Sequence, residues 1–346
     1  MIKYLGSKRL LLPRIVEEIR ALKPRRPVLD LFSGTARVAH ALKAAGLAVI
    51  ANDHNEYAWR LAHGLVVADR ERWQEPAARL VAKLNEAAEL AHPAGGWFTE
   101  TYARRARFFQ PANAARIEAA RRHLASLALD PELASVAMAS LLAAADRVDS
   151  TTGVQMAYLK EWAPRSERTF RLEVPELLPR ARAGAAEAWR LDALEAARRF
   201  TGDVAYLDPP YNQHSYLGNY HVGETLALGD EPEVFGVACK RVDVRTRRSR
   251  FNSRRATHAA LAEVLEALDG VALVLSFNDE GFISREAVEA LLARHGTVRV
   301  EAIPFRRYVG ARIGLHNPRG ERVGTISHLE NREFLFTVIP ARRRNA

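Results

Sequence analysis

The strongest constraint on the fold is the stretch PVLDLFSGTARVAHALKAAGLAVIANDHN, residues 27–55. Residues 28–32 form a short apolar run that predicts a strand, and Gly34 interrupts it. Helix-forming residues follow, and a second apolar run, residues 47–53, ends on Asp53. Strand, glycine turn, helix, strand and acid in this order are typical of the opening of an open nucleotide-binding sheet. We therefore expect an α/β fold.

The rest of the chain divides into a helical stretch and a return to strands. Residues 57–148 are rich in Ala, Leu, Arg and Glu at helical spacing, which predicts an insertion that is mainly helical. Four later runs predict strands, and we expect the last two to pair as an antiparallel edge hairpin: residues 203–209, 271–279, 297–305 and 333–340. We expect one domain from residues 1–56 and 186–346, with residues 57–185 inserted in it.

The turn LDLFSGTA leaves room for a ligand but lacks the residues that bind a pyrophosphate. It has one glycine, so it is neither a dinucleotide fingerprint nor a phosphate-binding loop with Gly-Lys-Ser/Thr. An NAD-dependent oxidoreductase would need the missing glycines. Asp53 lies where such folds bind a ribose diol, so an adenosine ligand without phosphates fits, namely S-adenosylmethionine. The alternative is an ordinary α/β turn.

A rigid turn follows the predicted strand 203–209, in the stretch YLDPPYNQHSY. Asp208 and the carbonyl of Pro209 would present two acceptors side by side, and Tyr211 would offer a ring for stacking on a planar base. Two convergent acceptors suit an amino group with two hydrogens. Accepting both N–H bonds draws the nitrogen lone pair out of ring conjugation and toward an electrophilic methyl group. A lone Asp-Pro pair is more often a solvated strand end.

Five motifs in order carry a resemblance to a known family. They are KYLGSK (3–8), DLFSGT (30–35), the acid of AND (Asp53), LDA (191–193) and DPPY (208–211). With these motifs the chain resembles the DNA adenine N6-methyltransferases of the Dam-like, DPPY-type DNA adenine methylase family. The resemblance implies a Rossmann-like methyltransferase fold with a mostly parallel seven-stranded sheet and a C-terminal antiparallel hairpin. One departure is Ser7, where family members commonly carry a second glycine.

The resemblance also implies residue roles. Lys8 would reach the carboxylate of the cofactor, Asp53 would bind the ribose hydroxyls, and Asp192 would accept from the adenine amine of the cofactor. The implied cofactor-binding residues are Tyr4, Lys8, Asp30, Phe32, Gly34, Asp53, Asp192 and Asp208. The implied catalytic residues, which would hold the target base, are Asp208, Pro209, Pro210 and Tyr211.

The charge of the chain favours a polyanionic partner. Its formal net charge is +10, and 44 of its 51 Lys and Arg residues are Arg, whose donor fork suits phosphate and guanine edges. Codon bias in a GC-rich genome is the competing explanation. The run RTRRSRFNSRR, residues 245–255, lacks apolar periodicity and predicts a mobile surface loop that could close over DNA. The stretch 95–110 mixes arginine with aromatic residues. The candidate DNA-binding residues are Arg105, Arg107, Arg245, Arg247, Arg248 and Arg250.

Together these patterns predict an enzyme that transfers a methyl group from S-adenosylmethionine to adenine N6 in double-stranded DNA after flipping the base. Cytosine N4 methylation and a catalytically silent DNA-binding module are the alternatives. We expect no metal site, because the histidines lack ligand spacing and Cys239 is the single cysteine. No apolar run is long enough to span a membrane, and we expect a cytoplasmic monomer, with a cognate restriction endonuclease as a candidate partner.

Overall fold

A computed structural model of the chain describes residues 8–156, 159–279, 281–306, 315–316, 322–324 and 330–341. Within these residues seven strands form one sheet, in the order β3-β2-β1-β4-β7-β11-β8. Five of the strands run parallel: β1 (Val28–Asp30), β2 (Val49–Asn52), β3 (Glu187–Trp189), β4 (Val204–Leu207) and β7 (Ala272–Asn278). The other two, β8 (Gly296–Arg306) and β11 (Glu330–Pro340), pair antiparallel, and β11 is also antiparallel to β7. The expected mostly parallel sheet with a C-terminal antiparallel hairpin is confirmed.

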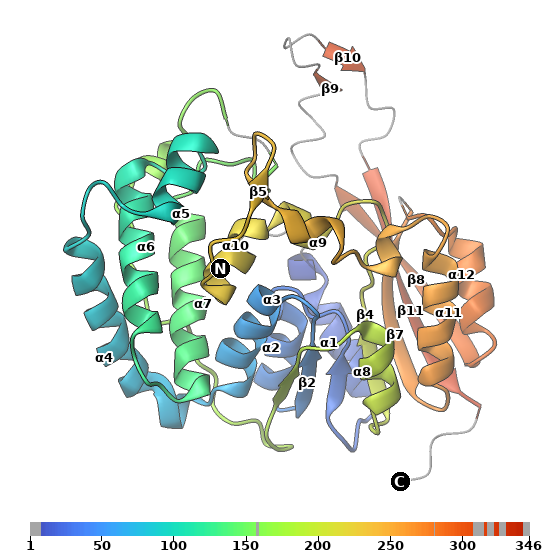
Figure 1. Cartoon of the computed structure of the whole chain (residues 1–346). Coiled ribbons are helices and arrows are strands. Elements are labelled where there is room, and N and C mark those ends of the chain that lie inside the picture. The colour runs from blue at the N-terminus through green and yellow to red at the C-terminus, as the bar shows by residue number, and fades with distance from the viewer. Residues whose placement is uncertain are drawn as a thin grey trace.

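Helices cover both faces of the sheet, because its buried strands are apolar on both sides. In β4, for example, Val204 and Tyr206 face one layer while Ala205 and Leu207 face the other. The first layer contains α1 (Leu12–Ala21), α2 (Arg37–Ala44) and part of α3 (Glu56–Ala62). The second contains α8 (Ala193–Arg199), α11 (Thr257–Ala267) and α12 (Arg285–Leu292). Figure 1 shows the resulting three layers.

A cluster of helices stands beside the sheet (Figure 1). It consists of α4 (Arg70–Glu89), α5 (Trp97–Thr99) with a π-helical turn (Glu100–Arg105), α6 (Pro111–Ala125) and α7 (Pro131–Arg147). Proline opens α6 and α7, where its missing N–H costs nothing, and the Asp130 carboxylate caps α7 by accepting from the Glu132 N–H at 3.0 Å. The core of this cluster also takes in α10 (His221–Leu228) and residues 238–239.

The chain between α7 and β3 is less regular than a mainly helical insertion implies. Among its described residues the only helix is a 3-10 turn, Pro164–Glu167. In place of regular backbone pairing, the side chains of two asparagines bind this segment to the helices. Asn113 accepts from the Phe170 N–H at 2.9 Å, and Asn85 accepts from the Leu172 N–H at 2.8 Å. Fixed side-chain amides of this kind satisfy backbone groups that would otherwise be buried without partners.

The predicted strands are all present, with shifted ends, and one strand of the seven-stranded sheet, β3, was missed. β3 is three residues long, lies at the edge of the sheet and has no fully buried residue, so it lacks the apolar pattern of a strand. Short elements follow β4: α9 (Tyr216–Asn219), the hairpin β5 (Val234–Phe235) and β6 (Lys240–Arg241), and 3-10 turns at Val242–Arg245 and Arg250–Asn252. No helix in the described residues is long and apolar enough to cross a membrane.

Candidate active site

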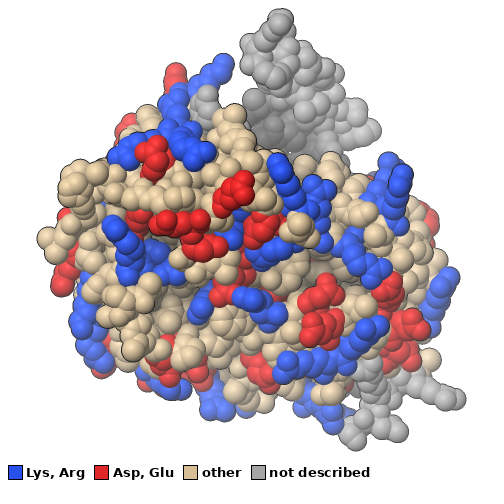
Figure 2. Space-filling model, in the orientation of Figure 1, with Lys and Arg blue, Asp and Glu red and all other residues tan. Residues whose placement is uncertain are grey.

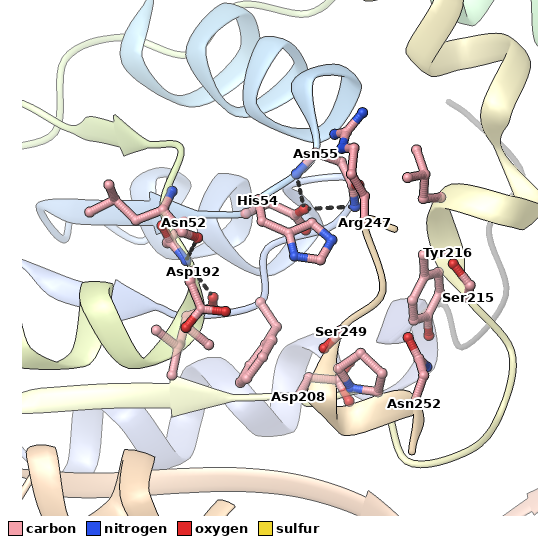
Figure 3. A pocket seen from close by; sticks show the side chains of 17 residues that line it. Asn52, His54, Asn55, Asp192, Asp208, Ser215, Tyr216, Arg247, Ser249 and Asn252 are labelled. Carbon is pink, nitrogen blue, oxygen red and sulfur yellow. Dashed lines mark hydrogen bonds between the residues drawn. The ribbon is translucent and has the colours of Figure 1, made fainter. Parts of the chain in front are cut away.

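A pocket opens where β1, β2 and β4 end at their carboxyl ends (Figure 3). In an open parallel sheet this edge, at the point where the strand order reverses, is the usual place for a ligand. In the sheet, β2 lies on one side of β1 and β4 lies on the other. The strand order therefore reverses between β1 and β4, and the pocket lies at that point. Its lining includes Phe32, Asn52, Asp53, Asp192, Asp208 and Tyr216. The sequence motifs that lie far apart in the chain therefore meet in one place.

The glycine turn after β1 is tied to the acid after β2. Gly34 has a positive φ of 52°, a conformation that glycine adopts without strain. Its N–H donates to Asp53 Oδ2 at 3.1 Å, while the backbone and side-chain N–H groups of Asn55 donate to Asp53 Oδ1 at 2.9 and 3.1 Å. Each carboxylate oxygen has two acceptor sites, so Asp53 is oriented by the protein and Oδ2 retains capacity for a ligand hydroxyl.

Asn52 fixes the spacing of the three loops that surround the pocket. Its side-chain amide donates to the carbonyls of Leu31 and Leu191, at 3.0 and 3.3 Å, and its Oδ1 accepts from the Leu191 N–H at 3.2 Å. The side chain is buried, so these bonds are protected from water. Sequence reasoning missed Asn52, although an asparagine in an apolar strand next to a predicted ligand acid was a usable signal.

Asp30 lies beneath the glycine turn and is fully buried. Its Oδ2 accepts from the Ala39 N–H at 3.1 Å, and within the described residues its Oδ1 has no hydrogen-bond partner. Burial raises the pKa of Asp30 to about 8, against the lowering effect of the bond from Ala39. The group is therefore largely protonated at neutral pH in the absence of a cationic ligand.

Asp192 and Phe32 both line the pocket. Asp192 Oδ1 accepts from the Leu194 N–H at 2.9 Å and so caps α8, which fixes the carboxylate while it lines the pocket. Phe32 meets the ring of Phe251 edge-on, with ring centroids 5.1 Å apart. Both predicted residues are thus fixed at the pocket, Asp192 by its cap of α8 and Phe32 by its contact with Phe251.

Asp208 follows β4 directly and places the start of the DPPY turn at the pocket. The ammonium of Lys8 lies 3.1 Å from Asp208 Oδ1 and also contacts the carboxylate of Glu333. Burial raises the pKa of Asp208 to about 6, even though Lys8 pulls it down. Tyr211 packs edge-on against Phe277, with centroids 5.6 Å apart, and Lys8 Nζ lies 5.6 Å from the centre of its ring. Because the pKa of Asp208 is about 6, its carboxylate is mostly ionised at neutral pH.

The arginine-rich run, residues 245–255, differs from the expected mobile loop because it is anchored at this pocket. Phe251 is buried in the core against Phe32. Arg247 lines the pocket and contacts the fully buried carboxylate of Glu224 at 2.6 Å. The single apolar residue in a run of charges was the overlooked sign of an anchor.

The other arginines of the run also differ in their surroundings. Arg250 forms two bonds to Glu263, at 2.7 and 2.6 Å, and Arg245 stacks 4.0 Å above the ring of Phe235. Arg248 is exposed. Intramolecular ion pairs and stacking reduce the availability of a guanidinium for phosphate, so Arg248 becomes the stronger candidate for a DNA contact.

Replacing Arg248 with Ala is expected to weaken binding to specific and unrelated DNA alike. One lost phosphate contact should lower the slope of log affinity against log salt by about one unit. Arg247→Ala is the matched control: it removes the same charge one position away, but its expected effect is loss of the Glu224 contact, with little change in slope. Fluorescence anisotropy across salt concentrations measures both. An unaltered slope for Arg248→Ala would place the run away from DNA.

Two candidate DNA-binding residues lie in the helical cluster. Arg105 is exposed at the end of its π-helical turn, and Arg107 packs its guanidinium 5.3 Å from the ring centre of Trp162. Neither lines the pocket described above. On the face seen in Figure 2, Lys and Arg are interspersed with Asp and Glu rather than gathered into one positive surface.

The structure brings most of the predicted site residues together. Phe32, Asp53, Asp192, Asp208 and Pro210 line the pocket itself, and Lys8, Asp30, Gly34, Pro209 and Tyr211 belong to its immediate support. Tyr4 and Ser7 lie outside the described residues. The described residues contain no group of three or more His, Cys, Asp or Glu placed to bind a metal ion. The residues that sequence reasoning missed include Asn52, Asn55, Tyr216, Asn252, Glu224 and Glu333.

The sheet order and the position of this pocket are those of a Rossmann-like methyltransferase fold. The model of one family, described as D12 class N6 adenine-specific DNA methyltransferase, matches residues 4–278. The chain therefore belongs to the D12 class N6 adenine-specific DNA methyltransferase family.

Several curated proteins are similar over most of this chain. Modification methylase StsI of Streptococcus sanguinis is 26% identical over 88% of the chain, which corresponds to 48% of that protein. Type II methyltransferase M.FokI of Planomicrobium okeanokoites is 29% identical over 88% of the chain and 49% of its own length. The chain thus spans about half the length of these two relatives. Type II methyltransferase M.NlaIII of Neisseria lactamica is 26% identical, over 96% of the chain and 99% of its own length.

Proposed function

We propose that the protein transfers a methyl group from S-adenosylmethionine to the N6 amine of adenine at specific sites in double-stranded DNA. The observation that carries this proposal is that Asp208 and Pro210 of the DPPY turn line the same pocket as Asp53 and Asp192. Membership of the D12 class family supports adenine as the target.

The residues of the pocket fit S-adenosylmethionine. Asp53 offers an acceptor for ribose hydroxyls at the end of β2, and Asp192 offers one for the adenine amine. Phe32 supplies an apolar wall, and Asp30 has a carboxyl oxygen without a partner among the described residues, suited to a ligand ammonium. Lys8 is the candidate for the ligand carboxylate. When bound, this cofactor supplies an electrophilic methyl group on a sulfonium.

At the target base the protein supplies acceptors. The carboxylate of Asp208 and the carbonyl of Pro209 accept the two N–H bonds of the amine, which raises electron density on its nitrogen. Tyr211 provides the aromatic face on which the base is held. Asp208 is a stronger acceptor when it is ionised, so the pKa of about 6 that burial gives it predicts falling activity below that pH. Acceptors fixed in advance at a buried turn need little reorganisation in the transition state.

A duplex buries the adenine amine in a base pair, so the target base must be flipped out at a cost of a few kcal/mol. We assign the recognition of DNA to the helical insertion, residues 57–185, with Arg105 and Arg107 as candidate contacts. The arginine-rich run is the second candidate contact, through Arg248 above all, because contacts within the protein hold Arg245, Arg247 and Arg250. One pocket serves one flipped base, so a monomer suffices. The relatives are named modification and type II methyltransferases, which makes a cognate restriction endonuclease the natural partner.

The product of the reaction tests this proposal. Unmodified duplex DNA incubated with the protein and S-adenosylmethionine is expected to yield N6-methyl-2′-deoxyadenosine on digestion and mass spectrometry. Sequencing that reads methylation on the same DNA gives the recognised site. N4-methylcytosine without N6-methyladenine would identify the alternative activity, and no modified base with retained DNA binding would identify a silent binding module.

A further inference from the structure

Three charged side chains from distant parts of the chain meet behind the DPPY turn. The Lys8 ammonium lies between the carboxylates of Asp208 and Glu333, at 3.1 Å from Asp208 Oδ1 and in direct hydrogen-bond contact with Glu333 Oε1. The Lys8 and Glu333 side chains are only 6% and 8% exposed, and that of Asp208 is 20% exposed. Glu333 lies outside residues 4–278, which the family model matches, so the family match assigns it no role.

The sheet topology explains why Glu333 reaches this position. β7 lies between β4 and β11, and Glu333 of β11 stands opposite Asn278, the last residue of β7. Because β11 runs antiparallel to β7, its first residues lie at the sheet edge where β4 ends and Asp208 begins. A side chain near the start of the last strand thus enters the region of the active site from behind.

Lys8 and Glu333 act on Asp208 in opposite directions. Burial alone would lower the pKa of Lys8, but Asp208, Tyr211 and Glu333 together outweigh it and raise that pKa well above its usual value. The ammonium therefore stays charged. It stabilises ionised Asp208, whereas the negative charge of Glu333 disfavours that ionisation. An ammonium shared between two carboxylates also binds each of them more weakly than it would bind a single carboxylate.

We infer that Glu333 is a positioning residue for methyl transfer: by holding part of the Lys8 ammonium, it leaves the Asp208 carboxylate free to accept from the target amine. This inference rests on the proposed function. Without Glu333, the three N–H donors of Lys8 would turn to Asp208, the nearest remaining carboxylate. Lys8 would then compete with the substrate amine for the same oxygens, and Asp208 would become a weaker acceptor.

The test compares wild-type protein with Glu333→Gln in single-turnover methylation of duplex DNA from pH 5 to 9. The rate constant at the optimum is expected to fall about tenfold, the equivalent of about one hydrogen bond. The acid limb of the profile is expected to move to lower pH by about one unit, because Asp208 loses a nearby negative charge. The rate constant is measured at saturating S-adenosylmethionine, because Lys8 is also the candidate for the cofactor carboxylate.

Apart from Glu333 on β11, the charged and titratable groups around Asp208 are the same in both proteins. They come from the 3-10 turn at Lys8–Leu10, from β1, β4 and α9, and from the DPPY turn itself: Lys8, Asp30, Tyr206, Tyr216 and Tyr211. Glu301→Gln on the neighbouring strand β8 is the matched control. It removes an ion-paired glutamate, bound to Arg14 at 2.7 Å, and should leave the profile as in the wild type.

Three results would overturn the inference or its basis. An acid limb at the wild-type pH, with the rate reduced equally at every pH, would assign Glu333 a merely structural role. An unchanged profile would assign it none. A wild-type protein that methylates no adenine would instead refute the proposed function. If Glu333→Gln does not fold, Lys8→Gln tests the same cluster: the limb should move to higher pH as two carboxylates face each other, and an unmoved limb contradicts the coupling.

Discussion

Replacing Asp208 with Ala is expected to lower the rate constant of methyl transfer by at least about 10²- to 10³-fold, the usual cost of removing one group that stabilises charge in a transition state. The carboxylate is matched to the amine as it develops positive charge, so its loss affects the transition state more than the bound ground state. Lys8 retains Glu333 as a partner, so the substitution leaves no buried ammonium without a counter-charge. We therefore expect a folded protein that still binds its cofactor.

Single-turnover methylation and calorimetric titration with S-adenosylmethionine separate the two effects. Asp208→Asn, which keeps the shape of the side chain and one carbonyl oxygen, should retain more activity than Asp208→Ala. Near-normal turnover in Asp208→Ala would show that the DPPY turn does not hold the target amine.

Replacing Asp53 with Ala is expected to have its main effect on cofactor affinity. The loss of its hydrogen bonds should cost about 1–3 kcal/mol, which raises the dissociation constant for S-adenosylmethionine about 5- to 150-fold. Part of the cost arises because Asp53 also orients the Gly34 turn and Asn55. At saturating cofactor, the rate of methyl transfer should stay closer to the wild-type rate than in Asp208→Ala.

Asp279 offers a matched control for this prediction. It also follows a parallel strand of the same sheet, β7, and its Oδ2 accepts from the Arg332 N–H at 3.2 Å, but it does not line the pocket. Asp279→Ala should therefore bind the cofactor as the wild type does. Equal losses of affinity in Asp53→Ala and Asp279→Ala would mean that both act through the stability of the sheet edge.

The fold could be predicted wherever the local pattern of residues carried the information. The unit from β1 to Asp53 and the strand before Asp208 combine apolar runs with glycine or proline at their ends, which limits the possible conformations. β3 could not be found in this way, because three half-exposed residues at a sheet edge form a strand only through pairing with β2. The irregular segment after α7 resembles neither helix nor strand locally, and its order depends on Asn85 and Asn113 in distant helices.

The candidate site was predictable where a motif marks the end of a strand, as with Asp53 and Asp208. Its supporting contacts were not, because they join residues that lie far apart in sequence. Lys8 and Glu333 are 325 positions apart, and no local pattern relates them. The arginine-rich run was misjudged for a similar reason: composition indicates a solvated loop, while the burial of Phe251 depends on a surface that another part of the chain provides.

The shared core of the helical cluster and α10 limits how this protein can acquire a new specificity. Val222, Leu226 and Cys239, which follow the DPPY turn, are buried among the helices that precede β3. If recombination exchanged only those helices, the new helices would have to pack against an apolar surface shaped for the original ones. Exchange between relatives would then have to carry both segments together, and changes in the helices should be accompanied by compensating changes beyond the DPPY turn. Recombination at the apparent boundaries of the insertion is thus a poor route to diversity for this architecture.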